Sequence, residues 1–312
     1  MMATRTLVLT LAWFAAVNAT ASVLSWMLAT GLLSPRQRDK SRLQLTLRLF
    51  PAFASIVFAG ALFLPSHWLL EPRDANETLG LAWYALALAG LWVLVRSSAR
   101  ALAIVRTGRQ LRIGERRATV DIAEVHEVDG LGGVSLAGVF RPRILIGPSI
   151  ARELSSAELE VAVAHELAHR QAFDNVARWA MVCAPDFFGG SRAARRLEQD
   201  WHAAAESLAD ARAVRGDSVR AVHLASALVK VARLAAKGPA APPVPAWSTL
   251  NDPPLLELRI RRLVTGAVPV ATSGRSRLVP AAVTLGVSLL VAAPACAGMI
   301  HRVTETLVNL LP

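Results

Sequence analysis

Several residue types are scarce in this sequence. Cysteine occurs twice in 312 residues, at Cys183 and Cys296, both in apolar sequence, so no disulfide framework is implied. The single tyrosine, Tyr84, lies in a long apolar run, which leaves no tyrosine as a catalytic hydrogen-bond donor. Acidic residues number 23 against 34 basic ones, for a formal net charge of +11. Because the basic residues lie beside apolar runs and do not alternate with aromatic ones, we expect no nucleic-acid partner and favour an anionic lipid surface.

Hydrophobic residues are abundant and gathered in long runs. They make up 54% of the chain, against roughly 45–50% in ordinary soluble domains. Four runs, at residues 7–33, 45–70, 79–95 and 278–300, approach or exceed the roughly 20 residues with which a helix crosses a bilayer. The first run contains a signal-peptide-like pattern, Ala19-Thr20-Ala21, but its apolar character continues to residue 33. We therefore interpret it as an uncleaved helix.

The short loops predict the orientation of the chain. Arginine and lysine are frequent between the first and second runs, after the third run and before the fourth, whereas residues 71–78 hold one arginine and three acids. Positively charged loops stay on the cytoplasmic side of a membrane. We therefore expect an integral protein of a bacterial cytoplasmic membrane, with the N-terminus and the short C-terminal tail outside and residues 104–277 inside.

The predicted organisation is three transmembrane helices within residues 1–103, a cytoplasmic domain at 104–277, and a fourth helix with a short tail at 278–312. In the domain, "ATVDIAEVHEVDG" and "GVSLAGVFRPRILIG" have the pattern of strands, joined by a hairpin turn at Gly130 to Gly133. Beyond Pro148 the periodicity is helical, and Ser155 with Glu158 makes a capping-box pattern. Residues 237–247 are rich in proline and are expected to form a surface linker. The fold class is an α-helical membrane protein with a mostly helical α+β domain.

The segment "VAVAHELAHRQAFDN" carries the strongest chemical signal. Residues four apart on a helix share a face, so His165 and His169 can present two imidazole nitrogens to one metal ion. Glu166 lies about 100° further round and can reach a water molecule on that ion without binding the ion itself. By chance this pentapeptide would occur in about one in a hundred chains with as many histidines. The pattern therefore predicts a zinc site rather than two unrelated histidines on a polar face.

A catalytic zinc ion takes three protein ligands, and the third should come from another element. Residues at successive i+4 steps of "RRLEQDWHAAAESLADARAV" are the candidates: Glu198, His202, Glu206 and Asp210. Spacing alone does not choose among them, and a solvated charged face would explain the same stripe.

"HELAHRQAFDN" followed by "WHAAAESLADARAV" resembles the gluzincin metallopeptidases, in which a downstream E-x-x-x-D supplies the third ligand. With three spans before the domain and one after it, the chain resembles the membrane peptidases of the beta-lactam sensor/antirepressor family. Those are similar in turn to the CAAX-protease and heat-shock membrane peptidases. The extracellular penicillin-binding domain of the antirepressor sensors has no counterpart here, since about a dozen residues follow the last run. Sensing of beta-lactams is therefore not expected.

The resemblance implies a zincin-like domain with one zinc ion per chain, held by His165, His169 and Glu206. It also implies that Asp210 accepts a hydrogen bond from a ligand histidine and fixes its tautomer. Asp174, in the family's "xxxDN" position, is a second candidate for such a role, or a plain surface acid.

The expected reaction is peptide-bond hydrolysis, with Glu166 moving the proton. A further donor to the oxyanion would come from His223 or from Arg259, which lies in "PPLLELRIRRL", similar to a late stretch of the family. Both have ordinary alternatives: helix packing for His223 and a structural ion pair for Arg259.

The expected substrates are cytoplasmic regulators or membrane proteins, and the strand segment "VSLAGVFRPRILI" is either a substrate-binding edge or an ordinary core strand. The predicted function is signal-transducing proteolysis, with membrane-protein quality control as one alternative. A non-catalytic transducer is the alternative from another class, and the intact Glu166 argues against it. A transporter is disfavoured because the runs hold few ionisable residues. The sequence does not predict the oligomeric state.

Overall fold

The computed structural model of the protein describes residues 2–32, 41–70, 79–110, 116–120, 123–236, 248–250, 253–266 and 278–310. The chain divides into two compact units. The first comprises Met1–Ala99, Ala184–Asp200 and Gly274–Pro312, and the second comprises Arg100–Cys183 and Trp201–Ser273. Thus Ala184–Asp200, which the sequence places between the third and fourth runs, packs with the first unit. The predicted linker at 237–247 and most of the charged loop residues used for orientation lie outside the described residues.

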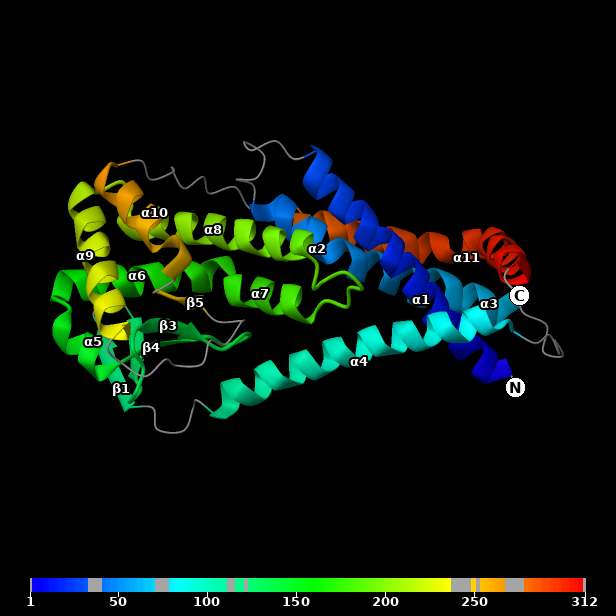
Figure 1. Ribbon diagram of the computed structural model, residues 1–312, viewed down its shortest axis with the longest axis horizontal. Helices are drawn as coiled ribbons and strands as arrows, with labels where there is room; N and C mark the ends of the chain where they lie inside the picture. Colours follow the sequence, from blue (N-terminus) through cyan, green and yellow to red (C-terminus); the bar gives the residue numbers. More distant parts are fainter. Residues whose placement is uncertain are drawn as a thin grey trace. The chain divides into compact units, whose positions relative to one another are not determined.

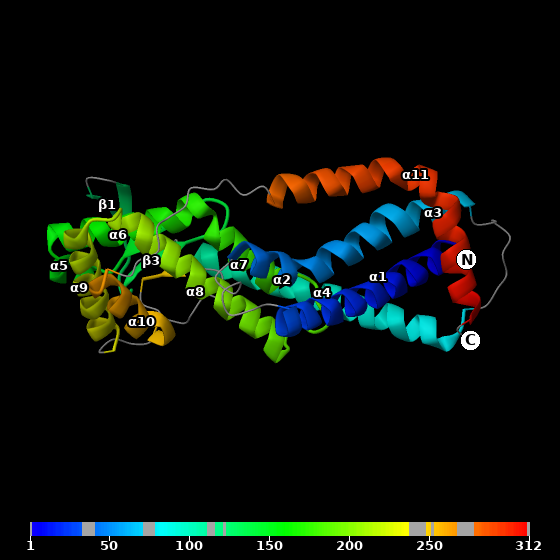
Figure 2. The same ribbon diagram turned by 90° about the horizontal axis from the view of Figure 1, so that it is seen from above.

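The first unit consists of long helices (Figures 1 and 2). They are α1 (Met2–Met27), continued by the π-helical η1 (Leu28–Leu32); α2 (Ser41–Ile56), η3 (Val57–Phe63) and α3 (Leu64–Leu70); α4 (Leu81–Gln110), which runs on into the second unit; and α11 (Leu278–Leu310). The third predicted run, 79–95, is thus only the first part of a longer helix. The helix continues because the arginine-rich residues after 95 contain no proline and only one glycine, Gly108.

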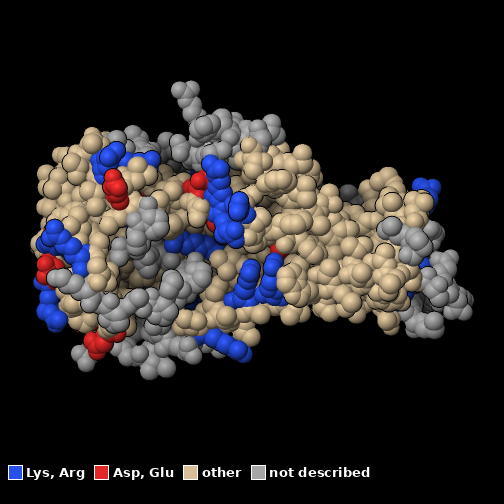
Figure 3. Space-filling model, viewed as in Figure 1, with Lys and Arg blue, Asp and Glu red and all other residues tan. Residues whose placement is uncertain are grey.

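Three helical stretches are long and apolar enough to cross a membrane: Ala3–Thr30, Arg42–Leu70 and Leu81–Thr107. Large apolar side chains lie on their outer faces, among them Trp68, Leu88 and Trp92, each more than half exposed. The face shown in Figure 3 carries a broad area without charged residues over this unit. These properties are those of a membrane protein. The fourth predicted run falls in α11, and its crossing of a membrane stays a prediction.

A buried polar cluster holds residues 184–191 among these helices. Arg48 of α2 donates to Asp186 at 3.0 Å, and Ser22 of α1 donates to the other oxygen of that carboxylate at 2.6 Å. Asn18 binds the same segment twice, through Pro185 and Phe187. Arg48 also pairs with Glu198 at 2.7 Å. The second apolar run therefore contains a buried arginine whose charge is paired with two carboxylates.

The second unit contains a five-stranded sheet in the order β1-β2-β4-β3-β5. The strands are β1 (Arg116–Val120), β2 (Ala123–Glu127), β3 (Val134–Ala137), β4 (Arg143–Ile146) and β5 (Ser248–Thr249). β2 pairs with β4 in parallel, and the other neighbouring pairs are antiparallel. The helices are α5 (Pro148–Glu153), α6 (Ser156–Ala172), α7 (Asp174–Cys183), the second part of α8 (Arg192–Val214), α9 (Ser218–Ala235) and α10 (Pro253–Val264).

The predicted hairpin turn at Gly130 to Gly133 is wrong. "ATVDIAEVHEVDG" itself forms the hairpin β1–β2, and the glycine-rich segment connects β2 to β3, which are not neighbours. A close backbone approach occurs instead at Gly147, directly after β4. A Cβ at Gly147 would lie 1.8 Å from the Leu131 carbonyl oxygen, and the Gly147 amide donates to the Gly133 carbonyl at 3.1 Å.

The substrate-binding edge proposed for "VSLAGVFRPRILI" is also not available over most of its length. β4 lies between β2 and β3, and β3 lies between β4 and β5. Beyond β5, the Asn175 amide donates to the carbonyls of Leu136 and Gly138 at 2.7 Å each. β3 and β4 therefore have neighbours on both sides and behave as ordinary core strands.

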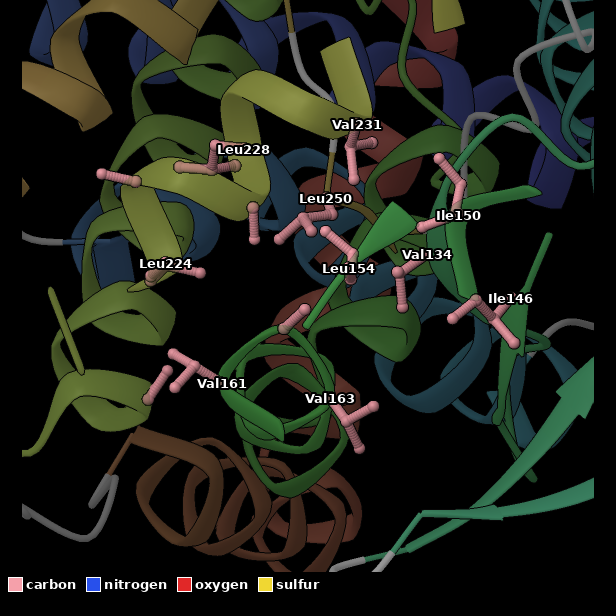
Figure 4. Close-up of a cluster of buried hydrophobic side chains, with 14 of the residues drawn as sticks. Val134, Ile146, Ile150, Leu154, Val161, Val163, Leu224, Leu228, Val231 and Leu250 are labelled. Carbon is pink, nitrogen blue, oxygen red and sulfur yellow. The ribbon is translucent and has the colours of Figure 1, made fainter. Parts of the chain in front are cut away.

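The core of this unit lies between the sheet, α6 and α9, as Figure 4 shows. α6 packs against β3, β4 and β5 and also against α9. Fully buried side chains from all of these elements meet there: Leu136, Ile144, Val161, Val163, Leu224, Leu228 and Leu250. At 1.5–3 kcal/mol for burying each large aliphatic side chain, this contact fixes α6 firmly in place.

α6 begins as the sequence predicts. The Ser155 hydroxyl accepts from the Glu158 amide, and the Glu158 carboxylate accepts from the Ser155 amide at 2.8 Å, which completes the capping box. The helix ends at Phe173, whose φ of 58° is left-handed. The turn that follows leads directly into α7.

Candidate metal centre

Four helices bring the charged side chains of the second unit together. α6 carries His165, Glu166 and His169 on its buried side. α8 contributes Glu206 and Asp210, α7 contributes Asp174 and Arg178, and α10 contributes Arg259. All eight side chains are buried, and those of the two histidines, Glu166 and Glu206 are fully so.

His165, His169 and Glu206 form a group that could hold a metal ion. The two Nε2 atoms are 3.1 Å apart, and oxygens of Glu206 lie 3.4 Å from His165 Nε2 and 3.3 Å from His169 Nε2. Ligands placed tetrahedrally at about 2.0–2.1 Å from zinc are about 3.3–3.4 Å apart. Each imidazole nitrogen approaches a different oxygen of Glu206, and one donor atom from each of the three side chains lies within 4.8 Å of the others, close enough to share one ion.

The other nitrogen of each histidine meets a carboxylate. His165 Nδ1 lies 3.0 Å from Asp210 Oδ1, and His169 Nδ1 lies 2.7 Å from Asp174 Oδ2. A proton on Nδ1, donated to the carboxylate, leaves the Nε2 lone pair directed at the shared centre. Asp174 and Asp210, both selected from the sequence, thus lie where they can fix the tautomers of the two histidines.

Two arginines flank Glu206. Arg178 Nη2 donates to Oε1 at 2.9 Å, and Arg259 Nη1 lies 3.0 Å from Oε2. Arg259 also binds both oxygens of Asp210, at 2.9 and 2.7 Å, and the carbonyl of Leu250. Its donors are engaged with these acceptors, in keeping with the ion-pair alternative considered for it.

Sequence reasoning missed Arg178. Its side chain is 8% exposed and contacts the same carboxylate as the metal-ligand candidates. The signal was a single arginine in the otherwise apolar stretch "NVARWAMVC", one turn after Asp174. A lone charged group on an apolar helix face has to meet an opposite charge when that face is buried.

The buried charges of the site do not balance by themselves. The carboxyl groups outnumber the guanidinium groups by two: Glu166, Asp174, Glu206 and Asp210 against Arg178 and Arg259. Uncompensated buried charge is costly. A divalent cation, or two protons on the histidines, would cancel the excess.

The pKa shifts describe the metal-free balance. Burial lowers the pKa of His169, but the carboxylates of Glu206 and Asp174 outweigh it and raise this pKa to about 10. Burial also lowers the pKa of His165, but hydrogen bonds to Asp210 and Glu206 outweigh burial and raise it. Burial also opposes the lowered pKa of Glu206, which His169 and Arg259 produce. Without metal, the site therefore favours a protonated His169 beside an ionised Glu206.

Glu166 differs from the other acids of the site. Its pKa is raised, chiefly by burial, although the two histidines pull it down part of the way. Within the described part of the chain neither of its oxygens has a hydrogen-bond partner. A fully buried carboxyl group without partners is rare and costly. It indicates a ligand or water that this group serves.

The remaining candidates are not part of the group of His165, His169 and Glu206. Glu198 pairs with Arg48 in the first unit, and His202 Nδ1 is 3.8 Å from Glu206 Oε1 and partly exposed. His223 is half-buried on α9, and among the described residues no hydrogen bond or ion pair joins it to the site. Of the four possible third ligands, the structure brings Glu206 into the cluster with the two histidines.

A cavity of about 270 Å³ lies next to His169. Its walls come from the end of β3, the turn to β4 and the end of α6: Leu136, Val139, Phe140, Pro142, Phe173 and Asn175 are among them. Phe140 and Phe173 are each 70% exposed. Phe140 also makes an edge contact with Trp179, with ring centroids 5.4 Å apart. An open cavity lined by aromatic residues and large enough for an amino-acid side chain therefore lies beside the site.

Comparison with protein-family models gives no match, and no curated protein matches the chain significantly. The geometry of the centre is therefore the basis on which a function can be proposed.

Proposed function

We propose that the protein is a membrane-anchored zinc-dependent endopeptidase that cleaves cytoplasmic regulators or membrane-associated proteins. One observation carries the proposal: two imidazole nitrogens and a carboxylate, all buried and close enough to share one ion, lie beside Glu166, a buried carboxyl group with no hydrogen-bond partner among the described residues.

The donor set favours zinc. Two imidazole nitrogens with one carboxylate oxygen are a common ligand set of catalytic zinc, whereas magnesium and calcium prefer oxygen ligands. A divalent ion also cancels the two excess negative charges of the buried groups. His165, His169 and Glu206 would hold the ion, and Asp174 and Asp210 would orient the two imidazoles.

The protein's own groups then account for the proton transfers. A bound zinc ion supplies a Lewis acid that makes water more acidic and polarises a carbonyl group. Glu166 accepts the proton of the attacking water, for which its raised pKa suits it, and returns that proton to the nitrogen of the leaving amine. Arg178 and Arg259 hold the Glu206 carboxylate in its ligating position. Arg259 is thus a positioning residue in this proposal.

The cavity beside His169 supports a peptide substrate. An extended peptide that reaches the centre could place one bulky apolar side chain between Phe140 and Phe173. The apolar first unit keeps the enzyme at a bilayer, which favours substrates that are themselves at the membrane. Neither feature separates signalling proteolysis from removal of damaged membrane proteins.

The test is the substitution Glu166→Gln in detergent-purified protein. We expect zinc to be retained at the wild-type level, because the ligands are untouched, and cleavage of unfolded casein to fall about 10²–10⁴-fold. Glu160→Gln, on the exposed side of the same helix, is the control and should cleave normally. Equal cleavage by wild type and Glu166→Gln would remove Glu166 as the base. Zinc binding without any cleavage by wild type would favour the non-catalytic transducer.

A further inference from the structure

We propose that His67, His301 and Glu305 form a second divalent-cation site in the helical first unit. One donor atom from each of the three lies within 4.8 Å of the others. His67 lies on α3, and His301 and Glu305 lie one turn apart on α11. Residues four apart on a helix point the same way, so α11 presents an imidazole and a carboxylate together to α3. The two helices lie side by side in both views (Figures 1 and 2).

His67 is held in place before any ion arrives. Its side chain is 2% exposed, and its ring stacks on Phe63 with centroids 5.2 Å apart. The ring of His301 lies 6.5 Å from it, centroid to centroid. His67 belongs to a helix that is apolar enough to cross a membrane. Ionisable groups buried in such helices are rare and mark functional sites more often than not.

The three donors can close around an ion with small movements. Ligands of tetrahedral zinc are about 3.3–3.4 Å apart, so the widest separation has to shrink by at most roughly 1.5 Å. His301 and Glu305 are only partly buried, so their side chains are free to make that adjustment. Two imidazoles with one carboxylate again select zinc or a similar transition metal over calcium and magnesium.

Arg5 gives the site a competitor. Arg5, in the first turns of α1, places its Nη2 3.3 Å from Glu305 Oε1. Further along the same helix, Ser22 binds Asp186. A cation at this position would take over Glu305 and release Arg5. The charge-based orientation of the chain places residues 5, 67, 301 and 305 outside the cytoplasm. The site would therefore bind metal ions from outside the cytoplasm.

Zinc stoichiometry in detergent-purified protein tests the inference. The protein is equilibrated with zinc chloride and a chelator of moderate affinity, which removes loosely held ions, and bound zinc is then measured. We expect about two ions per chain for wild type and about one for His301→Asn and for Glu305→Gln. Glu257→Gln, a 92% exposed carboxylate on α10, is the matched control and should bind as wild type does. A single monodisperse peak in size-exclusion chromatography checks that each variant is folded.

Arg5→Gln provides the second arm. Removal of the competing guanidinium should tighten zinc binding at this site severalfold, whereas a purely structural ion pair would leave zinc affinity unchanged. Equal zinc content in wild type, His301→Asn and Glu305→Gln overturns the inference. One ion in wild type and none in His301→Asn would support this site and defeat the zinc centre at His165 and His169, so the two proposals fail separately.

Discussion

At the scale of single residues, the candidate zinc centre is defined by a charge balance. Each ligand histidine has a carboxylate on its far nitrogen, and Glu206 has an arginine on each oxygen. Two negative charges are left over when all four carboxyl groups are ionised. A divalent cation would cancel both, and a proton on His169 cancels one of them in the metal-free protein.

Metal binding should consequently release protons. Because the pKa of His169 is raised to about 10, this ring is protonated near neutral pH in the metal-free protein. Zinc needs it deprotonated. We expect at least one proton released per ion at pH 7, and an apparent affinity that rises with pH until the pKa of His169 is passed. Titration calorimetry in buffers of different ionisation enthalpy measures this number. Zinc binding without proton release would show that the imidazoles are not the ligands.

The cavity beside His169 leads to a prediction about specificity. Phe140→Ala should lower kcat/KM about tenfold for peptides with a large apolar side chain near the cleaved bond, because a buried apolar side chain contributes roughly 1.5–3 kcal/mol. Peptides with alanine at that position should be cleaved as before. Phe188→Ala, another exposed phenylalanine but in the first unit, is the control. An equal loss for both kinds of peptide would show that Phe140 supports the fold of the site instead.

The sequence predicts much of this centre, and the omissions have a physical reason. His165, Glu166 and His169 follow from helical spacing alone, and resemblance selects Glu206, Asp210 and Asp174. Arg178 is different, because its partner Glu206 is 28 residues away on another helix. Spacing within a helix predicts which residues share a face, but not which faces of two helices meet.

At the scale of helices and strands, features set by neighbouring residues were predicted correctly, whereas the pairing of the strands was not. The capping box at Ser155 needs only three neighbouring residues, and the structure contains it. The sheet depends on the parallel pairing of β2 with β4, between which β3 intervenes in sequence. Alternation of apolar residues marks a strand but carries no information about its neighbour.

Glu158 links the start of α6 to α9 and makes the stability of the domain depend on pH. It accepts from Lys230 at 2.8 Å and from Ser226 at 2.6 Å. Burial acts to raise its pKa, but Lys230 and the hydroxyl and amide donors lower it to about 2. The unfolded carboxyl titrates near 4.5. The stabilisation is therefore fully present above about pH 4.5 and is lost as pH falls from 4.5 towards 2.

Glu158→Gln should lower the free energy of unfolding by about 2 kcal/mol at pH 7 and by much less at pH 3. Denaturant unfolding of metal-free protein at the two pH values measures the difference. Glu160→Gln removes a pair with Arg220 that is partly exposed, and should cost less than about 1 kcal/mol. A loss for Glu158→Gln that is the same at both pH values would contradict the role of the ionised carboxylate.

At the scale of the whole molecule, the division into two units does not follow the order of the sequence. Residues 184–200 belong with the long helices because Asp186 finds Arg48 and Ser22 there. No pattern within "APDFFGG" indicates this, since Arg48 and Ser22 lie more than a hundred residues earlier. The long apolar helices themselves were predictable, because length and hydropathy are local properties.

The orientation of the chain rests on its basic loops and can be tested directly. After replacement of Cys183 and Cys296 by serine, single cysteines are introduced as Asn76→Cys, in the loop of residues 71–78, and as Ser273→Cys, before the fourth run. In right-side-out membrane vesicles, a maleimide that cannot cross the bilayer should label the first variant at once. The second should be labelled only after detergent is added, because positively charged segments stay in the cytoplasm. The reverse pattern would place the domain that contains His165 and His169 outside the cytoplasm, so that only external proteins could be its substrates. His67, His301 and Glu305 would then face the cytoplasm.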